Sequence, residues 1–217
     1  MADLHYERIQ IVENNEPLVD LAQYPFLCDP AYYRMGLGDT PKMYARRAVA
    51  EKLVELQNGI LTGYQFKIWD PWRSRNVQRN VYSKFWNEMK NDHPDWGEAK
   101  LRHEVAVYVV APDQPGRIPP HSTGGAIDLT LADKATGHEL DMGTGFDHFG
   151  LEAHPDYFEN SENHLIRDNR RLLRNAMLKI GFTQDPDEWW HYDYGNQKWA
   201  EAAGKDEVLY GEITEPR

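Results

Sequence analysis

Two short stretches of the sequence carry side chains that could hold a divalent metal ion. His121 and Asp128 lie close together in the chain, and Glu188 stands three positions before His191. A hydrolytic zinc site commonly has three protein ligands and keeps a fourth position for water. A nearby carboxylate then takes a proton from that water as general base. We therefore predict one zinc ion per chain, held by His121, Asp128 and His191, with Glu188 as the base.

The surroundings of His121 and Asp128 favour a buried site. A proline-rich loop over residues 112–120 precedes His121, and Gly124-Gly125 lets the backbone turn closely. In the alternating run 126–131, Asp128 falls on the face opposite the apolar side chains. A carboxylate there is costly unless it is paired or bound to a metal. A buried aspartate hydrogen-bonded to a histidine would give the same pattern, so both interpretations stay open on this motif alone.

The spacing of Glu188 and His191 places a condition on the second stretch. Residues three apart on a regular strand point to opposite faces of the sheet. We therefore expect Glu188 to lie in the turn after residues 185–187, before the strand becomes regular. Trp189 and Trp190 would either shield the site from water or pack in the core, and for Trp189 the core is favoured.

Arg73 is the candidate for stabilising an oxyanion. It lies where a predicted strand turns into a helix, a frequent location for functional side chains. A guanidinium there could donate hydrogen bonds to the oxygen on which negative charge develops. Arg75, Arg79 and Arg117 could do the same on the sequence alone.

The remaining histidines and the single cysteine have a simpler explanation. The sequence contains neither the HExxH spacing of a helical zinc site nor a CxxC pair for a structural one. Cys28 excludes an internal disulfide, and its apolar neighbours indicate a buried thiol.

The elements that must position these residues follow from the apolar periodicity. We predict strands and loops up to residue 41 and a long irregular region over 132–160. Strands are predicted over 64–70, 126–131 and 188–194, and helices over 41–59 with Thr40 as N-cap, 74–90, 96–109 and 162–180. This order predicts an α+β fold in a single domain over residues 1–217, with a mostly antiparallel sheet flanked by helices. The charged tail over 205–217 is expected to be frayed.

Composition limits the partners of the protein. The 217 residues are 41% hydrophobic, enough to fill a core, and the formal net charge is -11. Because an acidic surface repels phosphates and anionic lipids, we expect neither nucleic acid nor membrane as a partner. No stretch approaches the roughly 18 apolar residues of a membrane span, and no secretory signal is evident, so a cytoplasmic protein is expected.

Several motifs together resemble a known group of enzymes. The run from His121 to Asp128 is similar to the metallopeptidase group shared by D-alanyl-D-alanine peptidases, lysostaphin-like enzymes and hedgehog domains. The whole set more narrowly resembles D-alanyl-D-alanine dipeptidases of the vancomycin-resistance type. The stretches that carry this resemblance are Asp70-x-x-Arg73, 121–131, 140–147, 169–174 and 188–192. They lie within a catalytic region of about 64–194.

The resemblance implies a fold, an activity and residue roles. It implies a hedgehog/D-Ala-D-Ala peptidase-like fold and zinc-dependent hydrolysis of D-alanyl-D-alanine in cell-wall metabolism. Glu188 would act as general base and acid, Arg73 would stabilise the tetrahedral intermediate, and Asp147 would anchor the substrate's free amino group. One departure stands out, because Pro119-Pro120 replaces small hydroxyl residues that contact substrate in these enzymes.

Two other functions compete with the dipeptidase. The first is a D,D- or L,D-carboxypeptidase or endopeptidase that acts on longer peptidoglycan peptides. The second is a zinc-binding module without catalysis, as in hedgehog domains. A small dipeptide is the expected partner of the dipeptidase, and a homo-oligomer is compatible with all three.

Overall fold

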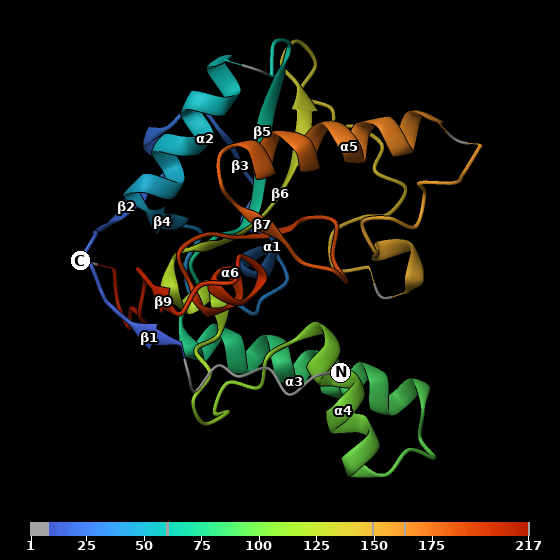
Figure 1. The fold of residues 1–217 in the computed structure, drawn as a ribbon. Helices are drawn as coiled ribbons and strands as arrows, with labels where there is room; N and C mark the ends of the chain where they lie inside the picture. Colours follow the sequence, from blue (N-terminus) through green and yellow to red (C-terminus); the bar gives the residue numbers. More distant parts are fainter. Residues whose placement is uncertain (1–8, 60, 149, 163, 217) are drawn as a thin grey trace.

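A five-stranded sheet forms the centre of the molecule (Figure 1). The computed structural model describes residues 9–59, 61–148, 150–162 and 164–216. In sheet order the strands are β3 (Leu27–Cys28), β5 (Tyr64–Asp70), β6 (Ala126–Asp133), β8 (His191–Asp193) and β7 (Thr183–Gln184). Only the β3–β5 pair of this sheet is parallel, and the other three pairs are antiparallel. The predicted α+β class with a mostly antiparallel sheet is therefore confirmed.

Two further sheets of two strands each lie outside the central sheet. Strand β2 (Leu18–Asp20) pairs antiparallel with β4 (Tyr44–Arg46), and β1 (Gln10–Ile11) pairs parallel with β9 (Glu207–Val208). The second pairing joins segments from opposite ends of the sequence. The remaining short elements are helices α1 (Ala31–Arg34) and α6 (Gln197–Ala202) and 3-10 turns at Leu21–Gln23, Pro120–Thr123 and Leu151–Ala153.

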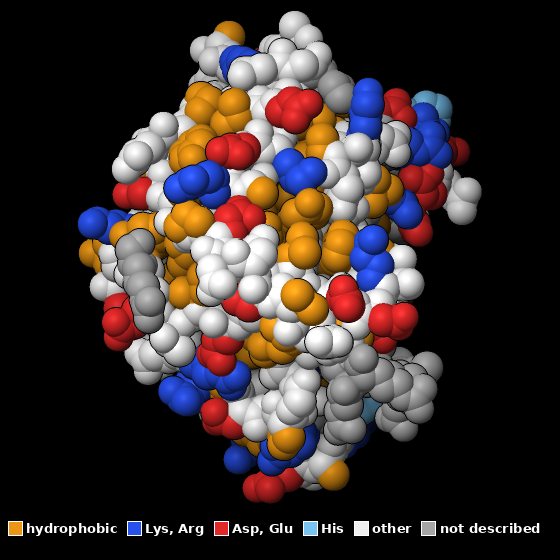
Figure 2. Space-filling view, turned by 60° about the vertical axis from the view of Figure 1, so that its left-hand side comes forward, with side chains coloured by type: hydrophobic (Ala, Val, Ile, Leu, Met, Phe, Trp, Pro, Cys, Tyr) orange, Lys and Arg blue, Asp and Glu red, His pale blue; other side chains and the backbone are white. Residues whose placement is uncertain are grey.

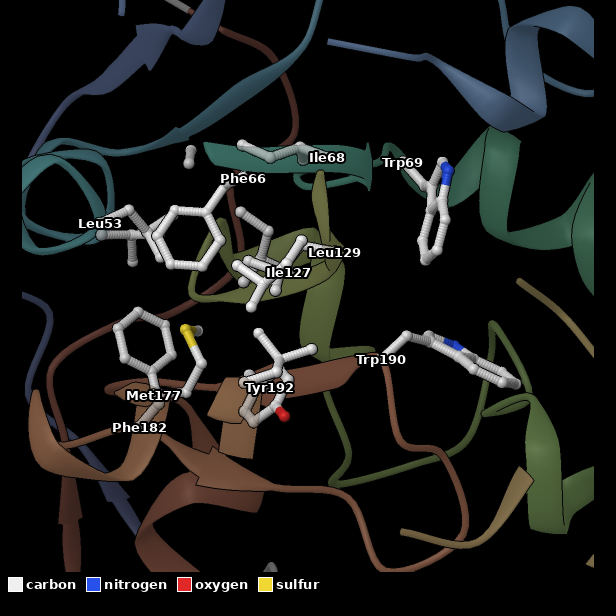
Figure 3. Packing of buried hydrophobic residues seen from close by; sticks show 14 of the residues in the cluster. Leu53, Phe66, Ile68, Trp69, Ile127, Leu129, Met177, Phe182, Trp190 and Tyr192 are labelled. Atoms are coloured by element: carbon white, nitrogen blue, oxygen red, sulfur yellow. The ribbon is translucent and has the colours of Figure 1, made fainter. Parts of the chain in front are cut away.

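One face of the central sheet is apolar and carries the main core. Helices α2 (Arg47–Gly59) and α5 (His164–Lys179) cover this face (Figure 1). The side chains that meet between them are drawn in Figure 3 and include Leu53, Phe66, Ile68, Ile127, Leu129, Met177, Phe182 and Tyr192. Alternation along β5 and β6 explains this face, because every second residue points the same way. The opposite face is left to polar side chains.

A helical hairpin forms a second, smaller core. Helices α3 (Arg75–Asp92) and α4 (Glu98–Tyr108) pack together through Val81, Phe85, Leu101 and Val105. The N-cap of α3 is Ser74, whose Oγ accepts a hydrogen bond from the Val77 amide at 3.3 Å. Both helices lie close to the ranges predicted from the sequence. They stand beside the polar face of the sheet and form one wall of the site described below.

The predicted start of the 41–59 helix at Pro41 was wrong. Residues Tyr44–Arg46 instead form β4, and the helix begins at Arg47. Proline at the first helical position and Thr40 as cap are local preferences, and pairing with β2 outweighs them here. The final strand is also shorter than predicted, since β8 covers only His191–Asp193.

The expectation of a frayed C-terminal tail was also wrong for its described residues, 205–216. Residues Glu207–Val208 form β9, and Tyr210 is 1% exposed. The guanidinium of Arg46 lies over the Tyr210 ring and donates to the Gly211 carbonyl at 3.2 Å. The charged composition of the tail does not predict these apolar and main-chain contacts.

The molecular surface mixes charges of both signs. On the face shown in Figure 2, acidic and basic side chains are interspersed rather than separated into large areas. Among the described residues, no helix combines the length and apolar character that spanning a bilayer requires.

Candidate metal centre

Three acidic and imidazole side chains form a row across the polar face of the sheet. Asp70 of β5 pairs with Asp128 of β6, which pairs in turn with His191 of β8. Directly paired residues of antiparallel strands point to the same face. The register of β5 shifts between Ile68 and Asp70, which moves Asp70 from the apolar face to the face of Asp128.

His121 reaches this row from a 3-10 turn that precedes β6. The turn ends at Gly124, whose positive φ of 72° suits glycine. At Gly125 a Cβ atom would lie 2.3 Å from the Tyr194 carbonyl oxygen, so only glycine lets β6 start beside β8. The Nδ1 atom of His121 donates to the Pro71 carbonyl at 2.7 Å, which turns Nε2 towards the sheet.

The two imidazoles and the Asp128 carboxylate converge on one point. His121 Nε2 lies 3.2 Å from His191 Nδ1 and 3.5 Å from Asp128 Oδ2, and His191 Nδ1 lies 3.0 Å from Asp128 Oδ1. All three side chains are buried. Ligands about 2.0–2.1 Å from a tetrahedral zinc ion lie about 3.3 Å apart, so this donor set fits zinc. The structure thus brings together the three residues predicted as ligands.

The carboxylate of Asp193 orients the His191 ring through Nε2, the ring nitrogen that does not face Asp128. This Nε2 atom lies 3.0 Å from Asp193 Oδ2, and Asn196 donates to the other oxygen of Asp193 at 2.6 Å. A histidine ligand usually gives its second ring N–H to such a partner. Sequence reasoning missed Asp193, although its place two residues after His191 puts both on the same face of the strand.

The electrostatics of the site favour a bound cation. Burial raises the pKa of the Asp70 and Glu188 carboxyls above their ordinary values, and it raises the pKa of Asp147 to about 7. Burial lowers the pKa of His121, and Arg73 adds to this effect. A divalent cation among these groups would offset the cost of their negative charges.

Glu188 lies at the edge of the donor set. Its Oε2 atom is 3.8 Å from His191 Nδ1, and its side chain is 15% exposed. As expected from the spacing, it precedes the regular part of β8. The turn that holds it is fixed by the Asp187 amide, which donates to Asp185 Oδ1 at 2.8 Å, and by the Trp189 amide, which donates to the Ala153 carbonyl at 3.0 Å.

Arg73 enters the site from the turn between β5 and α3. Its Nε atom is 3.2 Å from Asp70 Oδ2, and its guanidinium lies over the Tyr32 ring. Its Nη1 atom is buried without a hydrogen-bond partner among the described residues, so it can donate to a ligand. Of the four arginines considered from the sequence, Arg73 is the one that lines the cavity; Arg75 pairs with Glu212 and Arg79 with Asp113.

Asp147 is a further acidic group of the cavity. It adopts a positive φ of 58°, unusual for a residue other than glycine, and this conformation turns its carboxylate inwards. The Tyr32 hydroxyl donates to Oδ1 at 3.2 Å, while Oδ2 is buried without a hydrogen-bond partner among the described residues. An acceptor in this state suits a donor supplied by a ligand.

The lining of the cavity includes side chains that the sequence did not single out. It is formed by Tyr32, Arg73, Gln78, Phe85, Tyr108, Val109, Val110, Pro120, His121, Asp128, Asp147, Asp185, Glu188, His191 and Lys198. Trp189 and Trp190 are not among these residues. Both indoles pack in the core, where Trp189 contacts Trp69 and Trp190 contacts Phe146, so the shielding role is not supported.

Comparison with known proteins points to one family. A family model described as D-ala-D-ala dipeptidase, of the M15 peptidases, matches residues 36–207. A D-alanyl-D-alanine dipeptidase from Synechocystis sp. is 36% identical over 110 residues, which cover 46% of this chain and 44% of that protein. The chain thus spans less than half the length of that relative. A D-alanyl-D-alanine dipeptidase from Enterococcus faecalis is 29% identical over 159 residues, 70% of this chain and 73% of that protein. A solved vancomycin-resistance D,D-pentapeptidase in complex with Zn(II) aligns with a TM-score of 0.48 at 15% identity, covering 92% of this chain and 96% of that one.

Proposed function

Because the chain belongs to the D-ala-D-ala dipeptidase family of M15 peptidases, we propose that it is a zinc-dependent hydrolase of D-alanyl-D-alanine. The observation that carries this proposal is the convergence of His121, Asp128 and His191, whose donor atoms all lie within 4.8 Å of one another. We further propose that each chain holds one zinc ion there. The three protein ligands leave a tetrahedral ion one position for water or substrate.

When bound, zinc would polarise the scissile carbonyl and lower the pKa of water towards neutrality. Glu188 then takes the proton of the attacking water and delivers it to the nitrogen of the leaving D-alanine. Its position 3.8 Å from His191 Nδ1 places it beside the ligand set without making it a ligand. Burial raises the pKa of Glu188 and so helps it to hold the proton between these two steps.

Arg73 stabilises the charge that develops on the carbonyl oxygen. Its guanidinium is held by Asp70 and the Tyr32 ring, and its Nη1 atom is buried without a hydrogen-bond partner among the described residues. A preoriented donor in a buried site stabilises an oxyanion more strongly than water does. This arrangement also argues against a zinc-binding module without catalysis, which needs no such donor.

Asp147 selects the free amino group of the dipeptide. Its buried Oδ2 atom accepts a hydrogen bond from the substrate ammonium, while Tyr32 holds Oδ1. A fixed carboxylate in the lining of the cavity would set the distance from the substrate's amino group to the scissile bond. This favours a dipeptidase over enzymes that cut longer peptides.

A metal measurement combined with a product assay tests the function. The purified protein should contain about one zinc per chain and release D-alanine from D-alanyl-D-alanine, and a chelator should abolish the release. Absence of both zinc and activity in a folded, zinc-supplemented sample would overturn the proposal. Zinc binding without hydrolysis of any peptide would favour the non-catalytic module.

A second assay separates the dipeptidase from its nearest competitor. The same preparation is given the dipeptide and a muramyl pentapeptide that ends in D-Ala-D-Ala. The dipeptidase should use the dipeptide far better, whereas a carboxypeptidase should prefer the pentapeptide. A cytoplasmic location and a role in removing or recycling cell-wall precursors remain predictions, and cell fractionation tests the first.

A further inference from the structure

A half-buried lysine lines the cavity and has no role in the function proposed so far. Lys198 belongs to α6, and its Nζ atom forms an ion pair with Asp185. Helix α6 is anchored beside the metal ligands, because its N-cap Asn196 accepts from the Trp199 amide at 2.9 Å and donates to Asp193. The position of Lys198 is therefore coupled to the strand that carries His191.

Lys198 acts electrostatically on the metal ligands. Its charge is among those that lower the pKa of His121, and Asp128 is among the groups that act on Lys198. Burial, followed by the positive charge of Arg117, lowers the pKa of Lys198 to about 7. A cation that is desolvated and beside another cation is stabilised when a further carboxylate binds to it.

Few hydrogen-bond donors of the cavity are available to a substrate carboxylate. The Tyr32 hydroxyl donates to Asp147, and Gln78 Nε2 donates to the Val110 carbonyl at 2.6 Å. Pro120 has neither an N–H nor a hydroxyl to offer. The Lys198 ammonium carries three N–H donors, so its pairing with Asp185 leaves donors for a further acceptor.

Apart from the metal ligands and Glu188, the charged groups of the cavity form two clusters of contacts. Tyr32 contacts both the Arg73 guanidinium, which enters from the β5–α3 turn, and the Asp147 carboxylate. Lys198 pairs with Asp185, whose amide donates to the His191 carbonyl at 3.1 Å, on the side of β8. The metal ligands line the cavity together with both clusters. This arrangement matches a short zwitterion, with its ammonium at one cluster and its carboxylate at the other.

We propose that Lys198 binds the free C-terminal carboxylate of the substrate. This inference rests on the proposed function and defines its substrate class further. The site would require a carboxylate on the residue that leaves, so it would release a C-terminal amino acid and would not cut within a peptide. An amide at that end would offer Lys198 no negative charge.

A structural role for Lys198 makes a different prediction. If Lys198 only neutralises Asp185, Lys198→Met leaves a buried carboxylate without its partner. Adding Asp185→Asn should then restore the lost activity. If Lys198 binds substrate, adding Asp185→Asn to Lys198→Met should not restore the activity. Lys205→Met, at an exposed lysine just after α6, serves as the matched control.

The experiment compares D-alanyl-D-alanine with its C-terminal amide in zinc-loaded wild type, Lys198→Met, Lys198→Arg and Lys198→Met/Asp185→Asn. Wild type should prefer the acid. Lys198→Met should raise KM for the acid by about 10- to 100-fold, the loss of one charge-assisted hydrogen bond, with little change for the amide. Lys198→Arg should have a KM for the acid between those of wild type and Lys198→Met. Equal losses on acid and amide, or full restoration in the double variant, would overturn the inference.

Binding measurements separate this inference from the proposed function. Calorimetry with zinc-loaded Glu188→Gln follows D-alanyl-D-alanine and its amide without turnover, with and without Lys198→Met. If wild type does not hydrolyse the dipeptide but carboxylate binding still depends on Lys198, the proposed function fails alone. If wild type hydrolyses acid and amide equally and Lys198→Met binds both normally, the inference fails alone.

Discussion

The Nε2 atom of His191 lies 3.0 Å from Oδ2 of Asp193, on the side of the ring that faces away from Asp128. Because a carboxylate accepts a hydrogen bond, this contact places the ring proton on Nε2. Nδ1 lies 3.0 Å from Asp128 Oδ1, on the side of the metal ligands, and is the ring atom that would bind a metal. When an ion binds Nδ1, the contact with Asp193 keeps the remaining ring proton on Nε2.

Replacing Asp193 with asparagine should weaken zinc binding. The side chain keeps its shape but loses the charge that fixes the His191 tautomer, so zinc affinity should fall by about 10- to 100-fold. Competition with a chromophoric chelator measures the affinity directly. Asp95→Asn, at an exposed aspartate, controls for the loss of one negative charge. Unchanged affinity in Asp193→Asn would show that the contact does not tune the ligand.

Replacing Glu188 with glutamine should separate metal binding from turnover. The amide cannot carry the proton from water to the leaving amine, so kcat should fall by at least about 100-fold while zinc content stays near wild type. Metal analysis and the D-alanine release assay are run on the same sample. Glu55→Gln, on the exposed surface of α2, is the control. Near-normal kcat would remove Glu188 from its assigned role.

The donor set could be predicted from the sequence because its members are marked by local patterns. Two glycines and an apolar alternation around Asp128 indicate both its face and its burial. The spacing of Glu188 and His191 already required Glu188 to precede the regular part of the strand, and β8 does begin only at His191. These inferences use only chain stereochemistry, which does not depend on distant contacts.

Other parts of the site depend on contacts that no local pattern reports. Asp70 reaches the row of ligands through an irregularity in β5, whereas strict alternation assigns it to the apolar face. Lys198 lies on a short helix whose position depends on its contacts with β8. The tail around Tyr210 looked disordered because its burial depends on Arg46, far away in the sequence. Tertiary packing decides all three.

Replacing Asp147 with asparagine should affect substrates according to their amino terminus. The loss of the buried charge removes the partner of a free ammonium, so kcat/KM for the dipeptide should fall by about 10- to 100-fold. A substrate with an acetylated amino group never used that charge and should lose much less. The ratio of the two kcat/KM values is the measurement. Equal losses on both substrates would exclude Asp147 as the amino-group anchor.

The metal-free protein should lose stability as the pH rises through neutrality. Burial raises the pKa of Asp147 to about 7, whereas an unfolded aspartate titrates near pH 4. The folded state therefore binds more protons in this window, and the free energy of unfolding falls as the pH rises. His121, whose pKa is lowered, opposes this trend, so the test compares variants.

Urea unfolding of metal-free protein at pH 5, 6 and 7 measures the contribution of Asp147. In Asp147→Asn, the free energy of unfolding should decline less steeply than in wild type, by up to about 1.4 kcal/mol per pH unit. Zinc should reduce the decline in wild type, because it favours the charged carboxylates. A decline that is the same in wild type and Asp147→Asn would contradict the raised pKa.

The C-terminal segment connects the two turns that carry Arg73 and His121. The Trp72 indole donates to the Ile213 carbonyl at 3.0 Å, and the Ile213 amide donates to the Ser122 carbonyl at 2.9 Å. The two turns are also joined directly, since the Arg73 amide donates to the His121 carbonyl at 3.3 Å. Ile213 thus holds the neighbours of a catalytic candidate and of a metal ligand in one register.

A chain that ends at Gly211 should fold but work poorly. It loses both Ile213 hydrogen bonds and the Arg75–Glu212 ion pair, so the free energy of unfolding should fall by about 2 kcal/mol. Because small misplacements of catalytic groups are costly, kcat should fall by about 10- to 100-fold even well below the melting temperature. A chain that ends at Thr214 keeps Ile213 and is the matched control. If both truncations retain wild-type kcat and zinc content, the turns hold their positions without the tail.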